Sequence, residues 1–564
     1  MAEVNKVTKE YLPLAQACSD AFFILDEMHS LNHFYQFSLR YFLDAFDHVL
    51  LDNPNLKGTT DPQKRLHTVL DDLFLALFKR TARSLLHADH LVLAVLLAQV
   101  KLRARGDEID QDAYTFLLEG TGARSVDRND DDDDDGLDAT QRSRLRALAR
   151  LPGFEGVRDH IDEHAEEWRQ CLASDAPETA LPSFSAESDS VRATLQNALV
   201  IKCLRPDRLV PALACFVDRV FDRDLLLETR YDLDRLVQDE TTASTPLCLV
   251  SVPGHDASYR VDALVQATSA RCTSVAMGSQ EGYALADQAI ATAARNGSWV
   301  LLKNVHLAPS WLGQLEKRLQ NLGANRAFRL FLTMEATPKI PVNILRQGRV
   351  LMNEPPAGIR ANLLDSLGNV DARRLASGPA EKTRLYFLLA WFHAIVQERL
   401  RYAPLGWTKS IEFNDADLAA ALATVDTWMS IAAKGRANID PAAIPWKAIR
   451  TLVRENVYGG KIDTVSDQVL LDSFVERLFS PKAYDVDFAL VPGELDGTAT
   501  ALLAPDETRL ENFLAWARRL PEQEPPSYLA LPVMAERVIS AQQGQLVSAV
   551  NSSLLSKLTF SSLL

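Results

Sequence analysis

Hydrophobic positions recur along this chain with two different periods. Between residues 1 and 105 the period is helical, and the aromatic residues that follow it are Phe34, Phe37, Tyr41, Phe42 and Phe46. Together with neighbouring leucines they form a broad apolar stripe, which predicts a helix packed on two sides. Two more helices are expected, from about Pro62 and from about His87.

The period changes after residue 240. Short apolar runs alternate there with helical patterns, which is typical of a mainly parallel sheet covered by helices. The predicted strands are 247–250, 273–276, 299–302 and 329–333, and the predicted helices are 280–295 and 310–321.

Helical spacing returns between 361 and 490. The stretch Lys382–Leu400 is apolar nearly all round, so we expect it to be buried, with Trp391 in the core. The last part, 491–564, has weaker patterns: Pro-rich turns, one helix at 509–519 and a Ser/Leu tail.

An acidic run interrupts the chain at 127–135, with consecutive aspartates at Asp130–Asp135. Such a block repels itself and stays solvated. It is read as an interaction loop, a calcium loop or a surface insertion, although it lacks the spaced ligands and glycine of an EF-hand. We expect proteases to cut first between 122 and 140, and the helices before 105 to be separate from the core that follows.

The predicted division of the chain follows from these changes of pattern: 1–105, 106–240, 241–360, 361–490 and 491–564.

Composition narrows the class of protein. The 564 residues carry a net charge of −15, which argues against nucleic acid or an anionic membrane as the main partner. Six scattered cysteines without a C-x-x-C pair suit a reducing compartment and argue against a zinc site. The N-terminus lacks a signal-peptide pattern, and the longest apolar run, 91–100, is too short to cross a bilayer. We therefore expect the cytoplasm.

Candidate chemistry begins where the first predicted strand meets a turn and a helix, the outline of a phosphate-binding loop. Aligned on G-x-x-x-x-G-K-[ST], Ser258 takes the last position and Ala257 replaces the lysine. Asp256 and Ser251 then replace the two glycines, and Gly254 is the glycine left inside the turn. Asp256 would place a carboxylate among phosphate oxygens, with no lysine to offset their charge.

The strand at 299–302 ends in Lys303 and Asn304, where a working site has acidic residues for Mg²⁺ and water. The residues therefore predict a nucleotide-binding module that has lost its nucleotide, with no metal and no catalytic residue of its own.

Three weaker motifs each have a functional and a purely structural explanation. His160 and His164 fit the H-x-x-E-H zinc pattern, but adjacent glutamates favour a solvated helix face. His87 and His90 are a weaker case. Ser258 with His255 could suggest a nucleophile and base, yet no G-x-S-x-G elbow surrounds them.

Two further pairs of polar residues stand at the ends of predicted elements. Thr333 and Glu335 end a strand, where they could sense a bound nucleotide or merely terminate the strand. Arg399 and Arg401 end the buried helix, where either could face a phosphate or pair with acidic residues.

Long strings of this sequence resemble dynein heavy chains, closer to the cytoplasmic than to the axonal type. In the sixth AAA+ module the matching strings are 296–311, 328–335, 340–343 and 353–356, with 204–209 before it. In the lid they are 385–395, 397–407, 458–463 and 467–479, and the helices at 33–105 resemble the segment after the fifth module.

The resemblance implies an α/β AAA+ P-loop-type core with a parallel sheet, flanked by mainly α-helical domains. It also implies a piece of a minus-end-directed microtubule motor of the cytoplasm and cytoskeleton. In that family ATP and Mg²⁺ are used chiefly in earlier modules of a six-module ring, and the sixth does not hydrolyse ATP. The implied partners are the remaining modules, the linker and the subunits of the dynein complex.

This sequence departs from a whole motor in lacking an intact phosphate-loop motif and a heptad stalk, so the microtubule would be reached only through an absent stalk. Its stretch after Leu520 is short, and 552–564 resembles nothing in the family. The departures suggest a fragment, a truncated gene model or a separately encoded piece. The alternative functions are an autonomous NTP-binding AAA+-like protein and a helical scaffold.

Overall fold

Five parallel strands form the central sheet in the computed structural model. They are β1 (Leu247–Ser251), β2 (Cys272–Ala276), β3 (Trp299–Lys303), β4 (Arg329–Glu335) and β5 (Arg349–Asn353), in the order β2-β3-β4-β1-β5. Every neighbouring pair is parallel. The connecting helices are α12 (Ser258–Thr268), α13 (Gln280–Asn296), α14 (Pro309–Gln320) and α15 (Val342–Gln347).

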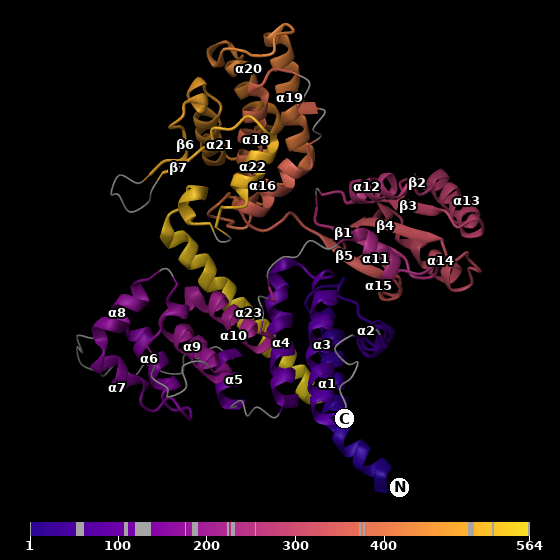
Figure 1. Ribbon diagram of the computed structural model, residues 1–564, viewed down its shortest axis with the longest axis vertical. Helices are drawn as coiled ribbons and strands as arrows, with labels where there is room; N and C mark the ends of the chain where they lie inside the picture. The colour runs from indigo at the N-terminus through magenta and orange to yellow at the C-terminus, as the bar shows by residue number, and fades with distance from the viewer. Residues whose placement is uncertain are drawn as a thin grey trace. The chain divides into compact units, whose positions relative to one another are not determined.

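Alternate residues of the strands enter two different cores, as the pleat requires. On β1, Cys248 and Val250 join a core that includes residues of α13, α14 and α15. Leu247 and Leu249 join the other, with residues of α12 and of α11 (Leu233–Asp239). Figure 1 shows α14 and α15 on the side of the sheet away from α12. The predicted α/β core with a parallel sheet is confirmed.

The structure describes residues 2–51, 53, 61–105, 111–118, 137–174, 176–182, 190–222, 225–226, 232–253, 255–370, 374–375, 378–493, 501–521 and 524–561. The acidic run at 127–135 and the predicted cleavage region around it lie outside these ranges, apart from residues 137–140. The chain divides into a core unit, Met1–Val252, Asp256–Asn353 and Arg537–Leu564, and a lid unit, Pro253–His255 and Glu354–Glu536.

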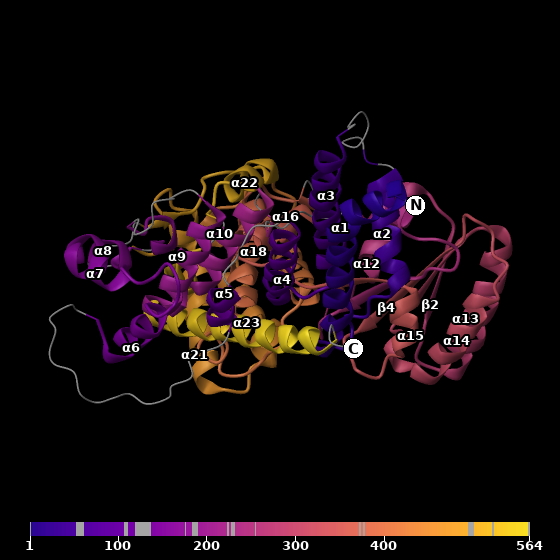
Figure 2. The ribbon, with the colours of Figure 1, turned by 90° about the horizontal axis from the view of Figure 1, so that it is seen from below.

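Helices make up the rest of the core unit. They are α1 (Ala2–Glu27), α2 (Leu39–Leu51), α3 (Pro62–Ala82), α4 (His87–Arg105), α5 (Gln111–Leu118), α6 (Ala139–Leu148), α7 (Val157–Glu163), α8 (Ala165–Ala173), α9 (Val191–Leu204) and α10 (Leu209–Phe221). Helices α1, α3 and α4 pack side by side (Figures 1 and 2). The starts of α3 and α4 are where the sequence predicts them.

Sheet and N-terminal helices are joined at the β5 edge. The Met352 N–H donates to the Arg83 carbonyl at 2.9 Å, and the Ser84 hydroxyl donates to the Val350 carbonyl at 2.6 Å. The expected separation between residues 1–105 and the sheet is therefore not found, since both belong to one compact unit.

The lid unit is mainly helical. It contains α16 (Ile359–Gly368), α18 (Glu381–Leu400), α19 (Asp415–Ala433), α20 (Trp446–Thr451), α21 (Val465–Leu478), α22 (Leu510–Ala517) and a short pair of strands, β6 (Ala489–Val491) and β7 (Leu502–Leu503). Helix α18 is buried along almost its whole length, and Trp391 is fully buried in it, as predicted.

The C-terminal helix α23 (Val533–Ser561) replaces the Ser/Leu tail that the sequence suggested. From Arg537 onward it belongs to the core unit, where Val547 and Leu554 enter the hydrophobic core. Gly544 permits this packing, because a Cβ there would lie 3.2 Å from Leu209 Cβ. No helix within the described ranges has both the length and the apolar character needed to cross a membrane.

Candidate functional site

The candidate site lies where β1, β3 and β4 reach their carboxyl ends. In an open parallel sheet ligands bind outside this edge, where the strand order reverses. Here β1 stands between β4 and β5, and α12 starts seven residues after β1 ends. Of the phosphate-loop residues, Asp256, Ala257 and Ser258 are described and Gly254 is not.

Asp256 binds the first residue of α12. Its Oδ1 atom accepts the Ser258 N–H at 2.9 Å and the Ser258 hydroxyl at 2.7 Å. In a working phosphate loop, backbone N–H groups at this helix start and the Ser/Thr hydroxyl serve phosphate and Mg²⁺. The carboxylate of the chain itself therefore engages donors that a nucleotide would use.

A buried hydroxyl network continues from this point to the neighbouring strands. Ser258 and Thr333 are each 2% exposed, and their hydroxyl oxygens lie 3.4 Å apart. The Thr333 hydroxyl oxygen also accepts the Asn304 N–H at 3.3 Å. Contacts among Asp256, Ser258, Thr333 and Asn304 thus connect the α12 start to the ends of β4 and β3.

The two residues at the end of β3 have partners within the core unit. Lys303 pairs with Asp262 on α12, with 3.1 Å between Nζ and Oδ2. Asn304 adopts a left-handed backbone conformation with φ of 59°, which Asn tolerates well. Ala257, at the lysine position, is fully buried and brings no charge. Hydrolysis needs a cation on the phosphates and acidic ligands for Mg²⁺. Ala257 supplies no cation at the lysine position, and neither Lys303 nor Asn304 has a carboxylate.

Thr333 and Glu335 have different environments at the end of β4. Thr333 belongs to the buried network, whereas the Glu335 N–H donates to His306 Nδ1 at 3.1 Å. The other ring nitrogen of His306 lies 3.6 Å from the Glu335 carboxylate. This His306 contact could not be predicted from the sequence, since the two residues are 29 positions apart.

The Ser258 hydroxyl, the candidate nucleophile beside His255, has a different partner. The Ser258 hydroxyl donates to Asp256, and His255 belongs to the lid unit. Burial lowers the pKa of His255, against the opposing effect of Asp415, Asp417 and Glu354.

The two arginines at the end of α18 are engaged inside the lid unit. Arg399 donates to the backbone carbonyls of Gly406, at 3.0 Å, and of Leu529, and burial lowers its pKa to about 10. Arg401 pairs with the buried carboxylate of Glu398 at 2.6 Å. These contacts favour the structural explanation of both arginines.

The histidine motifs have local partners. His160 and His164 stack with ring centroids 4.4 Å apart, and His160 Nδ1 accepts the Trp168 indole N–H at 3.1 Å. His90 bonds to the Ala82 carbonyl at 2.8 Å. Among the described residues no group of three or more His, Cys, Asp or Glu side chains could hold a metal ion.

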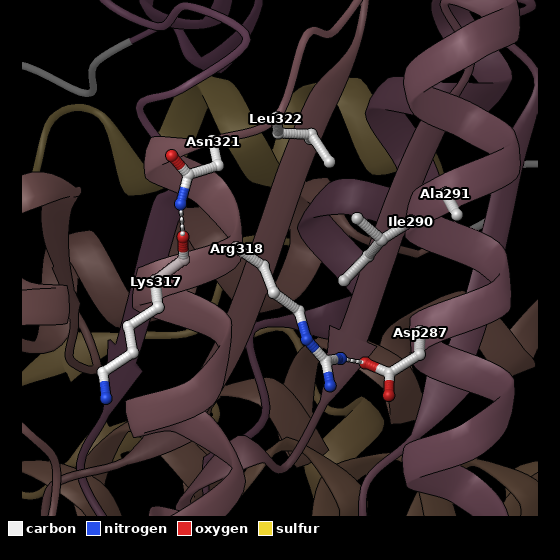
Figure 3. A pocket seen from close by; sticks show the side chains of 7 residues that line it. All are labelled: Asp287, Ile290, Ala291, Lys317, Arg318, Asn321 and Leu322. Atoms are coloured by element: carbon white, nitrogen blue, oxygen red, sulfur yellow. Dashed lines mark hydrogen bonds and ion pairs between the residues drawn. The ribbon is translucent and has the colours of Figure 1, made fainter.

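A surface pocket of about 440 Å³ opens elsewhere on the core unit, between α13 and the C-terminal end of α14 (Figure 3). Ile290, Ala291 and Leu322 give it an apolar lining, and an ion pair between Arg318 and Asp287 crosses it. None of its lining residues belongs to the phosphate-loop positions or to the end of β3.

Sheet order, helix placement and the altered loop define a P-loop-type AAA+ core with a helical lid. Two family models agree: the dynein heavy chain region D6 P-loop domain matches residues 242–352, and the dynein heavy chain AAA lid domain matches residues 382–535. The chain belongs to the dynein heavy chain family, as a region that contains these two domains.

Curated relatives agree with this assignment. The chain is 42% identical to the cytoplasmic dynein heavy chain of Drosophila melanogaster over 556 residues, which cover 96% of this chain and 12% of that protein. It is 44% identical to the cytoplasmic dynein heavy chain of Fusarium vanettenii, and the match covers 97% of this chain and 12% of that protein. Cytoplasmic dynein 2 heavy chain 1 of Rattus norvegicus is 30% identical, and the match covers 94% of this chain and 12% of that protein. The chain thus spans about an eighth of the length of these relatives.

Proposed function

We propose that this chain acts as the sixth AAA+ module, lid and C-terminal domain of a cytoplasmic dynein heavy chain. In this role it supports the ring of a microtubule motor and passes conformational change between neighbouring modules, without hydrolysing ATP. Its partners are then the remaining AAA+ modules and linker of the heavy chain and the other subunits of the dynein complex. The proposed location is the cytoplasm, on microtubules.

The bond from Ser258 to Asp256 is the observation that carries this proposal. The Asp256 carboxylate engages the buried hydroxyl and the first N–H of α12, at 2.7 and 2.9 Å. Phosphate oxygens would have to displace a like charge to reach these donors. Ala257 supplies no cation for the phosphates. Lys303, which pairs with Asp262, brings a positive charge to a position where Mg²⁺ would need a carboxylate.

A steady-state ATPase assay tests the proposal, with and without microtubules. The chain should show no turnover above background, because several parts that act as a unit are missing. It should also fail to bind microtubules, since its sequence has no heptad stalk. Ser258→Ala and Asn304→Ala serve as controls. Turnover that either change abolishes would favour the autonomous NTPase instead.

A further inference from the structure

Helix α2 has two apolar faces, and only one of them is covered by described parts of the chain. The inner face holds Tyr41, Phe42, Ala45 and Val49, all buried. The outer face holds three leucines whose exposed fractions are large: Leu39 at 54%, Leu43 at 46% and Leu50 at 37%.

The outer leucines lie on one line along the helix. At about 100° per residue, positions 39, 43, 46 and 50 fall within roughly 60° of one another. Phe46 completes this outer stripe, although it is half-buried and also packs against the hydrophobic core. Single exposed leucines are ordinary, whereas a continuous apolar stripe marks an interaction surface.

Contacts on the inner face fix which side of α2 points outward. Two guanidinium groups lie over the Tyr41 ring, at 5.2 Å from its centroid for Arg80 and 5.1 Å for Arg349. Arg349 also pairs with Asp44 at 2.5 Å, which ties α2 to β5. Rotating the outer stripe inward would break these contacts. The sequence predicted two packed sides for this helix, and the second side has no cover among the described residues.

We propose that the outer stripe of α2, Leu39, Leu43, Phe46 and Leu50, docks an amphipathic helix from another part of the same heavy chain. This rests on the function proposed above. About seven-eighths of the length of the relatives lies outside the matched region, and this part of the heavy chain could supply the docking helix. The stripe has no charged member, and Arg40 and Asp47 beside it carry opposite charges. Its chemistry therefore selects an apolar helix face over an acidic or basic peptide.

The size of the stripe favours an occupant within one polypeptide over a second copy. Helix α2 has 13 residues, and its stripe covers three turns, about 16 Å at 1.5 Å per residue. A stable dimer between separate chains usually buries more than about 1,000 Å². A smaller surface suffices within one chain, because the linkage raises the effective concentration.

Photo-cross-linking tests the proposal in a heavy chain that contains this segment. Benzoylphenylalanine at position 43 should cross-link to a residue of the same heavy chain outside the 564-residue segment. The matched control is position 51, also a leucine of α2, 77% exposed and turned about 100° from Leu50. The yield at 43 should exceed that at 51 several-fold. Cross-links confined to the segment itself would overturn the proposal.

The 564-residue chain alone provides the second arm. Leu43→Glu should leave its melting temperature within about 2 °C of wild type, as Leu51→Glu should, because both side chains are exposed. Sedimentation velocity should show a monomer for wild type and both variants. A wild-type dimer that Leu43→Glu disperses would identify a second copy as the occupant and overturn the proposal. The proposed function and the docking proposal fail in different ways. Production of this chain in the cell only as a separate protein would refute the proposed function. Absence of the predicted cross-link in an intact heavy chain would refute the docking alone.

Discussion

Asp256 is the residue on which the functional interpretation depends most. Asp256→Ala removes the acceptor of two donors of Ser258, which is 2% exposed. Leaving buried donors unsatisfied costs about 1–3 kcal/mol in free energy of unfolding. Asp256→Asn keeps an acceptor oxygen and should cost less than half as much. Chemical denaturation of both variants measures this difference. Equal losses, or none for Ala, would show that the carboxylate does not hold the start of α12.

Trp391 tests the lid core at the same scale. Its side chain is fully buried, with ring centroids 6.1 Å from Trp516 and 6.3 Å from Tyr528. Trp391→Ala should lower the free energy of unfolding by about 3–5 kcal/mol. Trp391→Phe keeps most of the aromatic volume and should cost clearly less. A loss below about 1 kcal/mol for Ala in urea unfolding would contradict the burial of α18.

Residue identity alone supports the proposal that the nucleotide site is degenerate. Ala257 stands where the phosphate-loop motif has its lysine, and neither Lys303 nor Asn304 has a carboxylate for Mg²⁺. These side-chain properties can be read from the sequence alone. The bond from Ser258 to Asp256 could not be predicted, because it depends on the side-chain conformation in the turn. Nor could the sequence decide between phosphate and lid for Arg399, since its carbonyl partners Gly406 and Leu529 come from distant positions.

At the scale of elements, the turn after the π-helix Leu452–Val457 can be tested at two adjacent glycines, Gly459 and Gly460, one of which serves as the control for the other. A Cβ on Gly459 would lie 1.7 Å from the Arg454 carbonyl oxygen, whereas one on Gly460 would lie 3.6 Å from that of Glu455. Gly459→Ala must therefore displace backbone and should cost at least about 2 kcal/mol. Gly460→Ala should stay within about 0.5 kcal/mol. Similar melting curves for the two variants would contradict the tight turn.

Two carboxylates meet at the start of α16. Glu398 accepts the Gly358 N–H at 2.8 Å, and Glu524 accepts the Ile359 N–H at 3.2 Å. Burial, and then the charge of Glu398, raise the pKa of Glu524 to about 7. Because the folded pKa lies above the ordinary one, the protonated form stabilises the fold at low pH, and this is lost as pH rises through 7.

The expected pH dependence follows from that sign. Glu524→Gln should melt above wild type at pH 8, where the wild-type carboxylate is charged, and the difference should vanish towards pH 5. Glu511→Gln, a change at an exposed residue of α22, is the control for removing one charge. Thermal melts across this pH range measure both. A constant difference between Glu524→Gln and wild type would rule out this titration.

Periodicity predicted the elements that bury one continuous apolar face. The strands β1 to β4 and the buried helix α18 lie where their patterns place them. Strand β5 was missed because Val350, Leu351 and Met352 form too short a run to distinguish from a loop. Helix α23 was missed because its Ser-rich sequence gives little periodicity, and its burial comes from packing on residues near Leu209, far away in the sequence.

At the scale of the molecule, the chain has a dynein heavy chain core and lid but only about an eighth of the length of its relatives. The role proposed above depends on the remaining modules of the same heavy chain. Two observations support this proposal. The described residues leave the outer stripe of α2 uncovered, and the Asp256 carboxylate accepts donors that a phosphate would use.

The most direct test is equilibrium binding of Mg²⁺–ATP to the purified chain by isothermal titration calorimetry. Because Asp256 occupies the Ser258 donors and Ala257 supplies no cation, we predict no saturable heat at nucleotide concentrations up to the millimolar range. Any binding free energy would then be about −4 kcal/mol or weaker. Saturable binding with a dissociation constant near 1 μM, about −8 kcal/mol, would contradict the account.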